Sequence, residues 1–243
     1  MHKPAPRPAP ARAMLIRLET RRRPGPRWAT LLLTLICVLV YVLLTLQAPG
    51  PRLALLLGWG SIPRTLLQPP PGPWWRVQGN AALHLLTALF MHADMPHLVG
   101  NMAFLLIYGL PVERAIGSLR LLLLFLIGGM LANIAGALSL PQAVMPIIGA
   151  SGAVSTIVGA YLALFPRAHL GVVLPLGAYL EFLRVPAALL IGLWVLLQVV
   201  FSRLGPSFGA IAWWAHLAGF ACGLLVGLAL RPQARARLRR GFR

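Results

Sequence analysis

Long apolar runs separated by short polar segments fill most of the chain, and this pattern predicts membrane-spanning helices. A helix needs about 20 mostly apolar residues to cross a hydrocarbon core about 30 Å thick. Such runs predict six spans, at residues 28–46, 96–111, 119–140, 147–165, 185–201 and 211–230. We therefore expect an all-α membrane protein, a single six-helix bundle over residues 28–230 with no internal repeat and no second domain.

The first run, at residues 28–46, follows a basic segment and could be mistaken for a signal peptide. It is longer than the roughly 7–15 apolar residues of a signal peptide, and the Gln47-Ala48-Pro49 that follows is no small-residue cleavage site. We interpret this run as a retained membrane anchor. Residues 47–95 are rich in proline, and we expect an irregular segment whose Trp74-Trp75-Arg76 suits the lipid headgroups.

The composition excludes an ordinary soluble domain. Hydrophobic residues make up 58% of the chain, charged residues make up 11%, and the mean hydropathy is +0.79. In typical soluble domains, hydrophobic residues make up roughly 45–50% and charged residues about 25%. The two cysteines, Cys37 and Cys222, both lie in apolar runs, so they indicate neither a disulfide framework nor a metal site.

The net charge of +18 comes from basic residues that gather at the two ends of the chain. We expect a basic arm at residues 1–27 and a basic tail at residues 231–243, both cytoplasmic and either disordered or bound to anionic lipid, with no nucleic-acid partner. With both termini inside, 18 of the 22 basic residues face the cytoplasm, so the positive-inside rule predicts an N-in, C-in protein. The Arg-, Ala- and Pro-rich composition suggests a bacterial inner (plasma) membrane. The sequence does not indicate an oligomeric state.

Four polar residues lie at a similar depth on three spans that run in the same direction. His97 and Asn101 are near the start of the second span, Ser151 starts the fourth, and His216 is near the start of the sixth. A rise of about 1.5 Å per residue puts all four within roughly the outer third of the bilayer. Polar groups are costly in lipid, so we expect them to face the bundle interior and to mark a functional site.

These residue types suit nucleophilic catalysis. Ser151 needs a base to take its proton, and His216 is the candidate general base. The acids Asp94 and Glu113 look badly placed to orient this histidine, which favours a Ser-His dyad over a triad. His97, Asn101 and the Ser151 backbone amide could form an oxyanion hole. No metal and no cofactor are implied.

Small residues face each other on two of these spans. Gly219, Gly223 and Gly227 line one face of the sixth span, below His216, and the fourth span carries Gly152, Ser155 and Gly159. Such faces allow membrane helices to approach closely, which would bring Ser151 to His216.

The same residues form a recognisable pattern. It reads His97-x-x-x-Asn101, Gly149-x-Ser151-Gly152 and Ala215-His216-x-x-Gly219-x-x-x-Gly223, supported by Trp75-Arg76, Phe90-Met91-His92 and Glu113-x-x-x-Gly117-x-x-Arg120. From about Trp75 to Gly227 the sequence resembles the rhomboid family of intramembrane serine proteases.

That resemblance implies a six-helix rhomboid-like bundle that cuts transmembrane segments of other proteins near the outer membrane face. It implies Ser151 as nucleophile, His216 as general base, and His97, Asn101 and the Ser151 amide as the oxyanion hole. The partners would be transmembrane protein substrates and membrane lipids. Many relatives carry a Tyr or Phe four residues after the nucleophile, where this chain has Ser155, so we expect Trp213 or Trp214 to hold His216 instead.

Other interpretations of the same residues stay open. Gly-Ala-Ser-Gly at residues 149–152 is also good helix-contact sequence, and His97 and Asn101 could be interhelical hydrogen-bond partners. A rhomboid-fold protein that binds membrane clients without cutting them is the main alternative function. A small transporter is a third possibility, although the spans contain no buried acids for coupling and no half-matched repeats.

Overall fold

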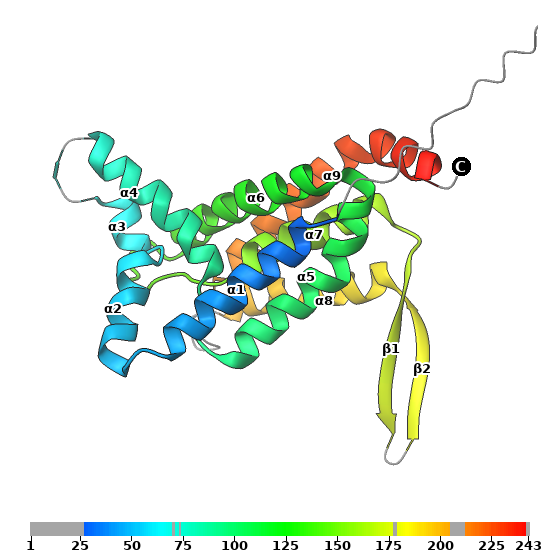
Figure 1. The fold of residues 1–243 in the computed structure, drawn as a ribbon, viewed down its shortest axis with the longest axis horizontal. Coiled ribbons are helices and arrows are strands. Elements are labelled where there is room, and N and C mark those ends of the chain that lie inside the picture. The colour runs from blue at the N-terminus through cyan, green and yellow to red at the C-terminus, as the bar shows by residue number, and fades with distance from the viewer. Residues whose placement is uncertain (1–26, 70, 73, 177–178, 205–211, 242–243) are drawn as a thin grey trace, which may run out of the picture.

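The computed structural model describes residues 27–69, 71–72, 74–176, 179–204 and 212–241. Most of these residues form helices (Figure 1). The helices are α1 (Ala29–Thr45), α2 (Pro49–Trp59), α3 (Pro63–Leu67), α4 (Trp74–Thr87), the 3-10 helix η1 (Ala88–Phe90), α5 (Met95–Ile116), α6 (Ser118–Ser139), α7 (Ser151–Leu164), α8 (Ala187–Leu204) and α9 (Trp213–Gly241). Two strands, β1 (His169–Leu176) and β2 (Tyr179–Pro186), complete the described part.

A helix covers most of each of the six apolar runs that the sequence predicts as spans, and α5, α6, α8 and α9 extend beyond their runs. Four of these helices, α5, α6, α8 and α9, are long and apolar enough to cross a membrane. The helices α1 and α7 are apolar but shorter, with 17 and 14 residues. The prediction of a mostly helical membrane protein is thus confirmed, whereas the number of spans stays a prediction.

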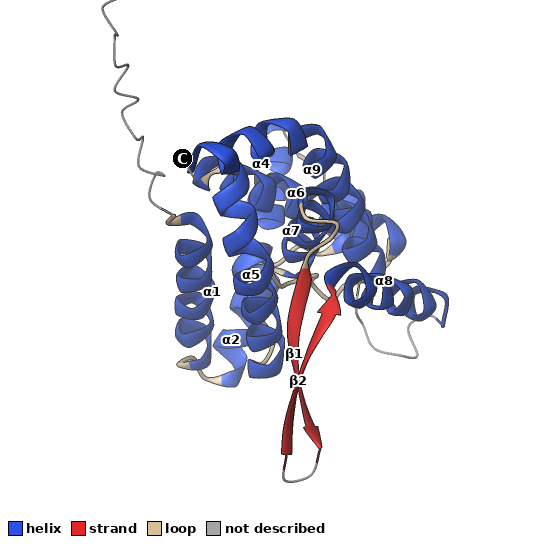
Figure 2. Cartoon of the chain, turned by 90° about the vertical axis from the view of Figure 1, so that its right-hand side faces the viewer, coloured by secondary structure: helices blue, strands red, loops and turns tan. Residues whose placement is uncertain are grey.

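Two expectations about secondary structure are wrong. Residues 47–95 are largely helical because proline at the first turn of α2 and of α3 starts a helix instead of breaking it. The protein is not all-α, because β1 and β2 pair as antiparallel strands, with His169 opposite Pro186, and they project from the bundle in Figures 1 and 2. Of the two alternatives for the basic tail, disorder does not hold for its described part, since α9 continues to Gly241, and binding to anionic lipid stays a prediction. The arm at residues 1–27 lies almost entirely outside the described residues.

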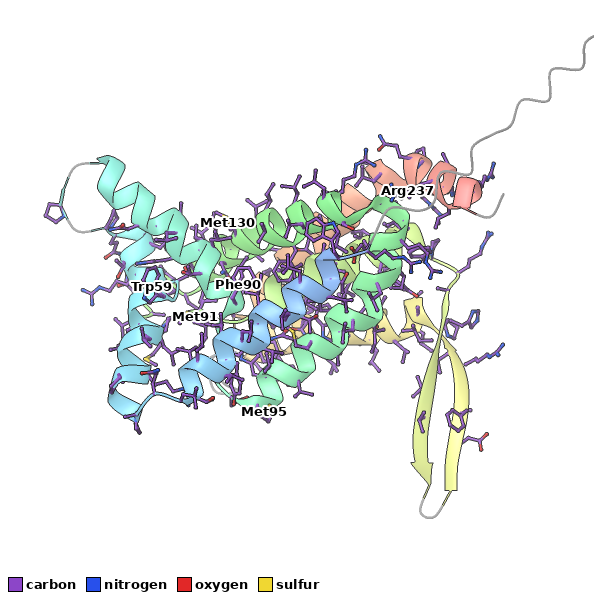
Figure 3. The ribbon with its side chains drawn as sticks, in the orientation of Figure 1. Trp59, Phe90, Met91, Met95, Met130 and Arg237 are labelled. Carbon is purple, nitrogen blue, oxygen red and sulfur yellow. The ribbon has the colours of Figure 1, made fainter. Side chains whose placement is uncertain are left out.

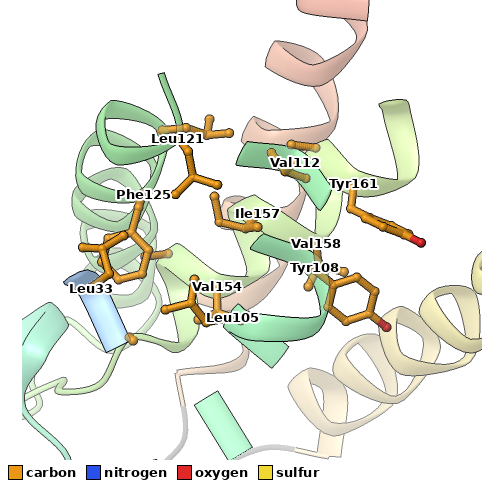
Figure 4. Close-up of a cluster of buried hydrophobic side chains, with 14 of the residues drawn as sticks. Leu33, Leu105, Tyr108, Val112, Leu121, Phe125, Val154, Ile157, Val158 and Tyr161 are labelled. Carbon is orange, nitrogen blue, oxygen red and sulfur yellow. The ribbon is translucent and has the colours of Figure 1, made fainter. Parts of the chain in front are cut away.

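The helix α7 is the centre of the bundle. It contacts α5, α6 and α9, and Figures 1 and 2 both place it among these helices. Every residue of α7 except Ser151 and Leu162 is buried. Figure 4 shows the core around it, where fully buried Leu105, Phe125 and Ile157 come from three different helices. Because protein surrounds α7, its length does not have to match the thickness of a bilayer.

A buried carboxylate ties α1 to the start of α6. Glu113, 1% exposed near the end of α5, accepts hydrogen bonds from the backbone N–H groups of Ala29 (2.8 Å) and Thr30 (3.0 Å). It also accepts from the hydroxyls of Thr30 (2.6 Å) and Ser118 (2.7 Å). A carboxylate here satisfies the free N–H groups of the α1 N-terminus and complements its dipole. It fixes α1 antiparallel to α5.

The two ends of the bundle differ in chemistry. One end holds the Glu113 cluster and the guanidinium of Arg237, which lies beside Gly117. Figure 3 shows Arg237 at this end, far from Met95 at the start of α5. The starts of α5, α7 and α9 all lie at the opposite end, so these three helices are parallel.

The helices α7 and α9 approach each other so closely that their backbones touch. A Cβ atom on Gly219 would collide with the carbonyl oxygen of Gly152, and one on Gly223 with the carbonyl oxygen of Thr156. From the other side, a Cβ on Gly159 would collide with the carbonyl oxygen of Phe220. Gly152 also faces α6, where its Cβ would lie 2.7 Å from that of Ala132. The glycines expected to line this contact therefore lie in it.

Gly223→Ala is expected to force α7 and α9 apart. The added methyl group has no room beside the Thr156 carbonyl, so the free energy of unfolding should fall by about 1–3 kcal/mol or more. Thermal unfolding in detergent measures the change. Gly192→Ala on α8 is the matched control because its Cβ meets nothing within 4 Å, and it should be neutral or slightly stabilising. Equal stability of the two variants would contradict the close packing.

Candidate active site

Ser151 and His216 meet at the ends of the two helices that touch. Ser151 is the first residue of α7, and His216 lies in the first turn of α9. The Nε2 atom of His216 is 2.9 Å from the Oγ atom of Ser151. This is hydrogen-bonding distance for a serine O–H that donates to an unprotonated imidazole nitrogen. The pair predicted from the sequence is therefore brought together across 65 residues of chain.

The other imidazole nitrogen has a partner that the sequence prediction missed. The Nδ1 atom of His216 is 2.7 Å from the Oε1 atom of Gln198 on α8. Gln198 is 6% exposed, so this contact is shielded from the surroundings. One signal could have found it, since Gln198 is the single amide in the apolar run at residues 185–201.

Aromatic rings also flank His216. The ring of Trp213 meets the imidazole edge-on, with centroids 6.1 Å apart, and the ring of Trp194 lies at 6.4 Å. Trp213 was expected beside this histidine, whereas Trp214 is 46% exposed. Ser155 does not face the imidazole: its hydroxyl donates to the backbone carbonyl of Ser151 within α7, at 2.6 Å.

His97 and Asn101 converge on the turn that precedes Ser151. A Cβ atom on Gly149 would lie 2.6 Å from Nε2 of His97 and 3.8 Å from Nδ2 of Asn101. The Nδ2 atom of Asn101 is buried and has no hydrogen-bond partner among the described residues. A buried amide N–H without a partner is costly, and such a group beside the turn that leads into Ser151 is available to bind a ligand oxygen.

The turn itself is held by its backbone. Gly149 has a φ of +115°, a conformation that residues with a side chain rarely adopt. Its N–H donates to the carbonyl of Ala88 at 2.8 Å. The next N–H, of Ala150, points to Nε2 of His92 at 3.5 Å. These contacts connect the turn to the segment before α5.

His92 supports this turn as a neutral acceptor. Burial in the loop before α5, with the nearby His97 adding to the effect, lowers the pKa of His92 to about 4. Its ring meets that of His97 edge-on, with centroids 5.1 Å apart. An unprotonated Nε2 can accept the Ala150 N–H, so His92 has the structural role that its loop position favours.

Neither candidate acid contacts His216. Asp94 caps α5 by accepting from the backbone N–H of His97 at 2.8 Å, and Glu113 lies in the cluster at the other end of the bundle. Among the residues that the structure describes, no group of three His, Cys, Asp or Glu side chains could hold a metal ion. The site brings together a hydroxyl, an imidazole and a nearby amide N–H donor.

The fold and the site together define a helical integral membrane protein with a serine and a histidine in hydrogen-bonding contact inside its bundle. Comparison with known proteins gives the family. Residues 71–233 match the model of the rhomboid domain, and the chain belongs to the rhomboid family.

Relatives with this domain differ in activity. The chain is 32% identical over 163 residues to RHOMBOID-like protein 6, mitochondrial, of Arabidopsis thaliana, covering 65% of this chain and 47% of that protein. It is 33% identical over 125 residues to Rhomboid protease GluP of Bacillus subtilis (strain 168), covering 51% and 22%. It is 28% identical over 148 residues to Inactive rhomboid protein 1 of Drosophila melanogaster, covering 61% and 9%. The chain thus spans less than half the length of each of these relatives.

These relatives come from a plant, a bacterium and an animal. They do not support the bacterial inner membrane that the composition suggested, and they leave the membrane of residence unassigned. The family includes a protein named as a protease and one named as inactive. Activity has to be argued from the site.

Gly149→Ala is expected to disturb the turn before Ser151. The alanine is strained at a φ of +115°, and its methyl group would press on the His97 ring, so the free energy of unfolding should fall by about 1–2 kcal/mol or more. Thermal unfolding in detergent tests this. The control is Gly58→Ala on α2, whose Cβ would meet nothing within 4 Å. A variant as stable as the control would show that the turn tolerates a side chain.

Proposed function

We propose that the protein is an intramembrane serine endopeptidase that cleaves transmembrane segments of other membrane proteins. The single observation that carries the proposal is the 2.9 Å contact between Nε2 of His216 and Oγ of Ser151. A serine is a weak nucleophile by itself, and an adjacent base is the usual means of activating it. Membership of the rhomboid family supports the same reaction class.

In the proposed reaction, Ser151 Oγ attacks the scissile carbonyl carbon and its proton passes to Nε2 of His216. The carbonyl oxygen becomes an oxyanion, which His97, Asn101 and the Ser151 amide stabilise. The C–N bond then breaks, and His216 returns the proton to the leaving nitrogen. Water, with its proton taken by the same histidine, hydrolyses the acyl-enzyme and restores Ser151.

The partly exposed surroundings of the pair fit this reaction. Ser151 and His216 are each only partly buried, although most of α7 is fully enclosed. Hydrolysis needs water at the nucleophile, and in this proposal the site opens toward the outer membrane face. A substrate helix enters laterally from the bilayer and unwinds locally, because an intact helix hides its scissile carbonyl in its own hydrogen bonds.

The proposed topology has six spans over residues 28–230, with the arm at residues 1–27 and the tail at residues 231–243 in the cytoplasm. The parallel directions of α5, α7 and α9 support it, since all three begin at the end that carries Ser151. Basic side chains such as Arg114, Arg237 and Arg239 lie toward the opposite end of the bundle or beyond it. The positive-inside rule assigns that end to the cytoplasm.

A catalytically silent protein that binds membrane clients is the second candidate. It is favoured by the relative that is named an inactive rhomboid protein. It differs from the protease in one measurable property, the reactivity of Ser151. An activated serine reacts with a fluorophosphonate, whereas a serine that only packs between helices does not.

Ser151→Ala and His216→Ala should each abolish cleavage of a labelled model transmembrane substrate by purified protein in liposomes. The first variant has no nucleophile and the second has no base, so both should also lose fluorophosphonate labelling. Ser202→Ala and His169→Ala are the matched controls. The Ser202 hydroxyl donates to the backbone carbonyl of Val199 within α8, and His169 starts β1, beyond the end of α7 that is opposite Ser151, so both variants should cleave at the wild-type rate. Normal cleavage by either of the first two variants would sink the dyad. Wild-type protein that neither cleaves nor reacts with the probe would favour the silent protein.

Asn101→Ala should slow turnover much more than it weakens substrate binding. Loss of one oxyanion donor typically lowers kcat by about 100- to 1,000-fold, because the donor acts on charge that develops in the transition state. Steady-state kinetics with the same substrate separate the two effects. A rise in KM at constant kcat would argue for a substrate contact in place of an oxyanion role.

A further inference from the structure

Gln198 is the one polar residue on the buried face of α8. The buried residues of this helix are Ala187, Ile191 and Gln198, spaced so that they lie on one helical face toward the bundle. Large parts of the other faces are exposed, with Leu189 and Leu196 more than half exposed. A primary amide in an apolar span is costly unless it has a hydrogen-bond partner. Its partner here is Nδ1 of His216, at 2.7 Å.

This contact decides which nitrogen of the imidazole carries the proton. A neutral histidine has one N–H and one free nitrogen, and the partner of one nitrogen fixes the state of the other. The Gln198 carbonyl oxygen accepts a hydrogen bond, so Nδ1 carries the proton and donates it. Nε2 is then free to take the proton of Ser151. An amide turned the other way would offer N–H donors to Nδ1 and leave Ser151 without a base.

The acceptor is also neutral, which suits its place in the fold. A carboxylate at this position would be a buried charge beside an apolar helix, and burying a charge costs far more than burying an amide. The rings of Trp194 and Trp213 flank the same imidazole, so its rotation is limited from two further sides. Packing limits the rotation of the imidazole but does not select its tautomer, and the amide makes that selection.

We propose that Gln198 is a positioning residue that holds His216 in the Nδ1-protonated tautomer and aims Nε2 at Ser151. This role rests on the proposed protease function. It adds to the Ser151–His216 pair a third residue, from α8, that orients the imidazole without taking up a proton.

The kinetic test compares the wild type with Gln198→Met, which keeps the length of the side chain without its amide acceptor. For Gln198→Met we expect kcat to fall by about 10- to 100-fold with little change in KM, because the wrong tautomer cannot act as base. Leu196→Ala, on the exposed side of α8, is the matched control and should keep the wild-type kcat. Thermal unfolding confirms that each variant is folded.

A second readout does not depend on cleavage. Nitrogen-15 NMR of histidine-labelled protein, with the His216 signals identified from His216→Ala, reports which ring nitrogen carries the proton. We expect Nδ1–H in the wild type and loss of that preference in Gln198→Met. A wild-type protein with the proton on Nε2 would overturn the proposal, as would a Gln198→Met variant with unchanged kcat and tautomer.

The two proposals fail in different ways. If the wild type neither cleaves nor labels while Gln198→Met still changes the tautomer, the protease function fails and the positioning role stands. If the wild type cleaves and Gln198→Met is indistinguishable from it, the positioning role fails and the protease function stands.

Discussion

The backbone contact between α7 and α9 is the constraint on which the site depends. Each carbonyl oxygen in this contact occupies the space that a side chain would fill on the facing glycine. The two helices therefore have almost no freedom to slide, because a shift would bring these oxygens against residues that have a side chain. Ser151 and His216 stand at the same end of this contact, one turn or less above it. Their 2.9 Å separation therefore follows from the glycines below them more than from any attraction between the two side chains.

The remaining helices arrange the surroundings of that contact. The Glu113 cluster fixes α1 against α5 at one end of the bundle, using hydrogen bonds that a carboxylate can make only when it is buried among donors. At the other end, α5 brings Asn101 and His97 to the turn at Gly149. Polar groups at one end of the bundle thus hold helices together, and those at the other end form the candidate active site.

Much of the site could be predicted from the sequence because its parts obey short-range rules. His97 and Asn101 share a helical face, Ser151 starts a helix, and the Gly219–Gly223 spacing indicates a close contact. The helices within residues 47–95 were missed because proline marks both irregular segments and helix starts. The hairpin was missed because its strands have no strict alternation of apolar and polar residues, and Gly171 and Pro175 are residues that argue against a strand.

Gln198 was missed for a different reason, which concerns geometry across helices. Its being the single amide in an apolar run marks the residue but not its partner, and only the packing of α8 against α9 brings its oxygen to His216. The other buried residues of α8 are apolar and adjust to small movements, whereas a hydrogen bond of 2.7 Å does not. A displacement of α8 would therefore break the hydrogen bond between Gln198 and His216 before it opened the apolar contacts of the helix. On this geometry, the position of this largely exposed helix determines which nitrogen of the His216 ring carries the proton.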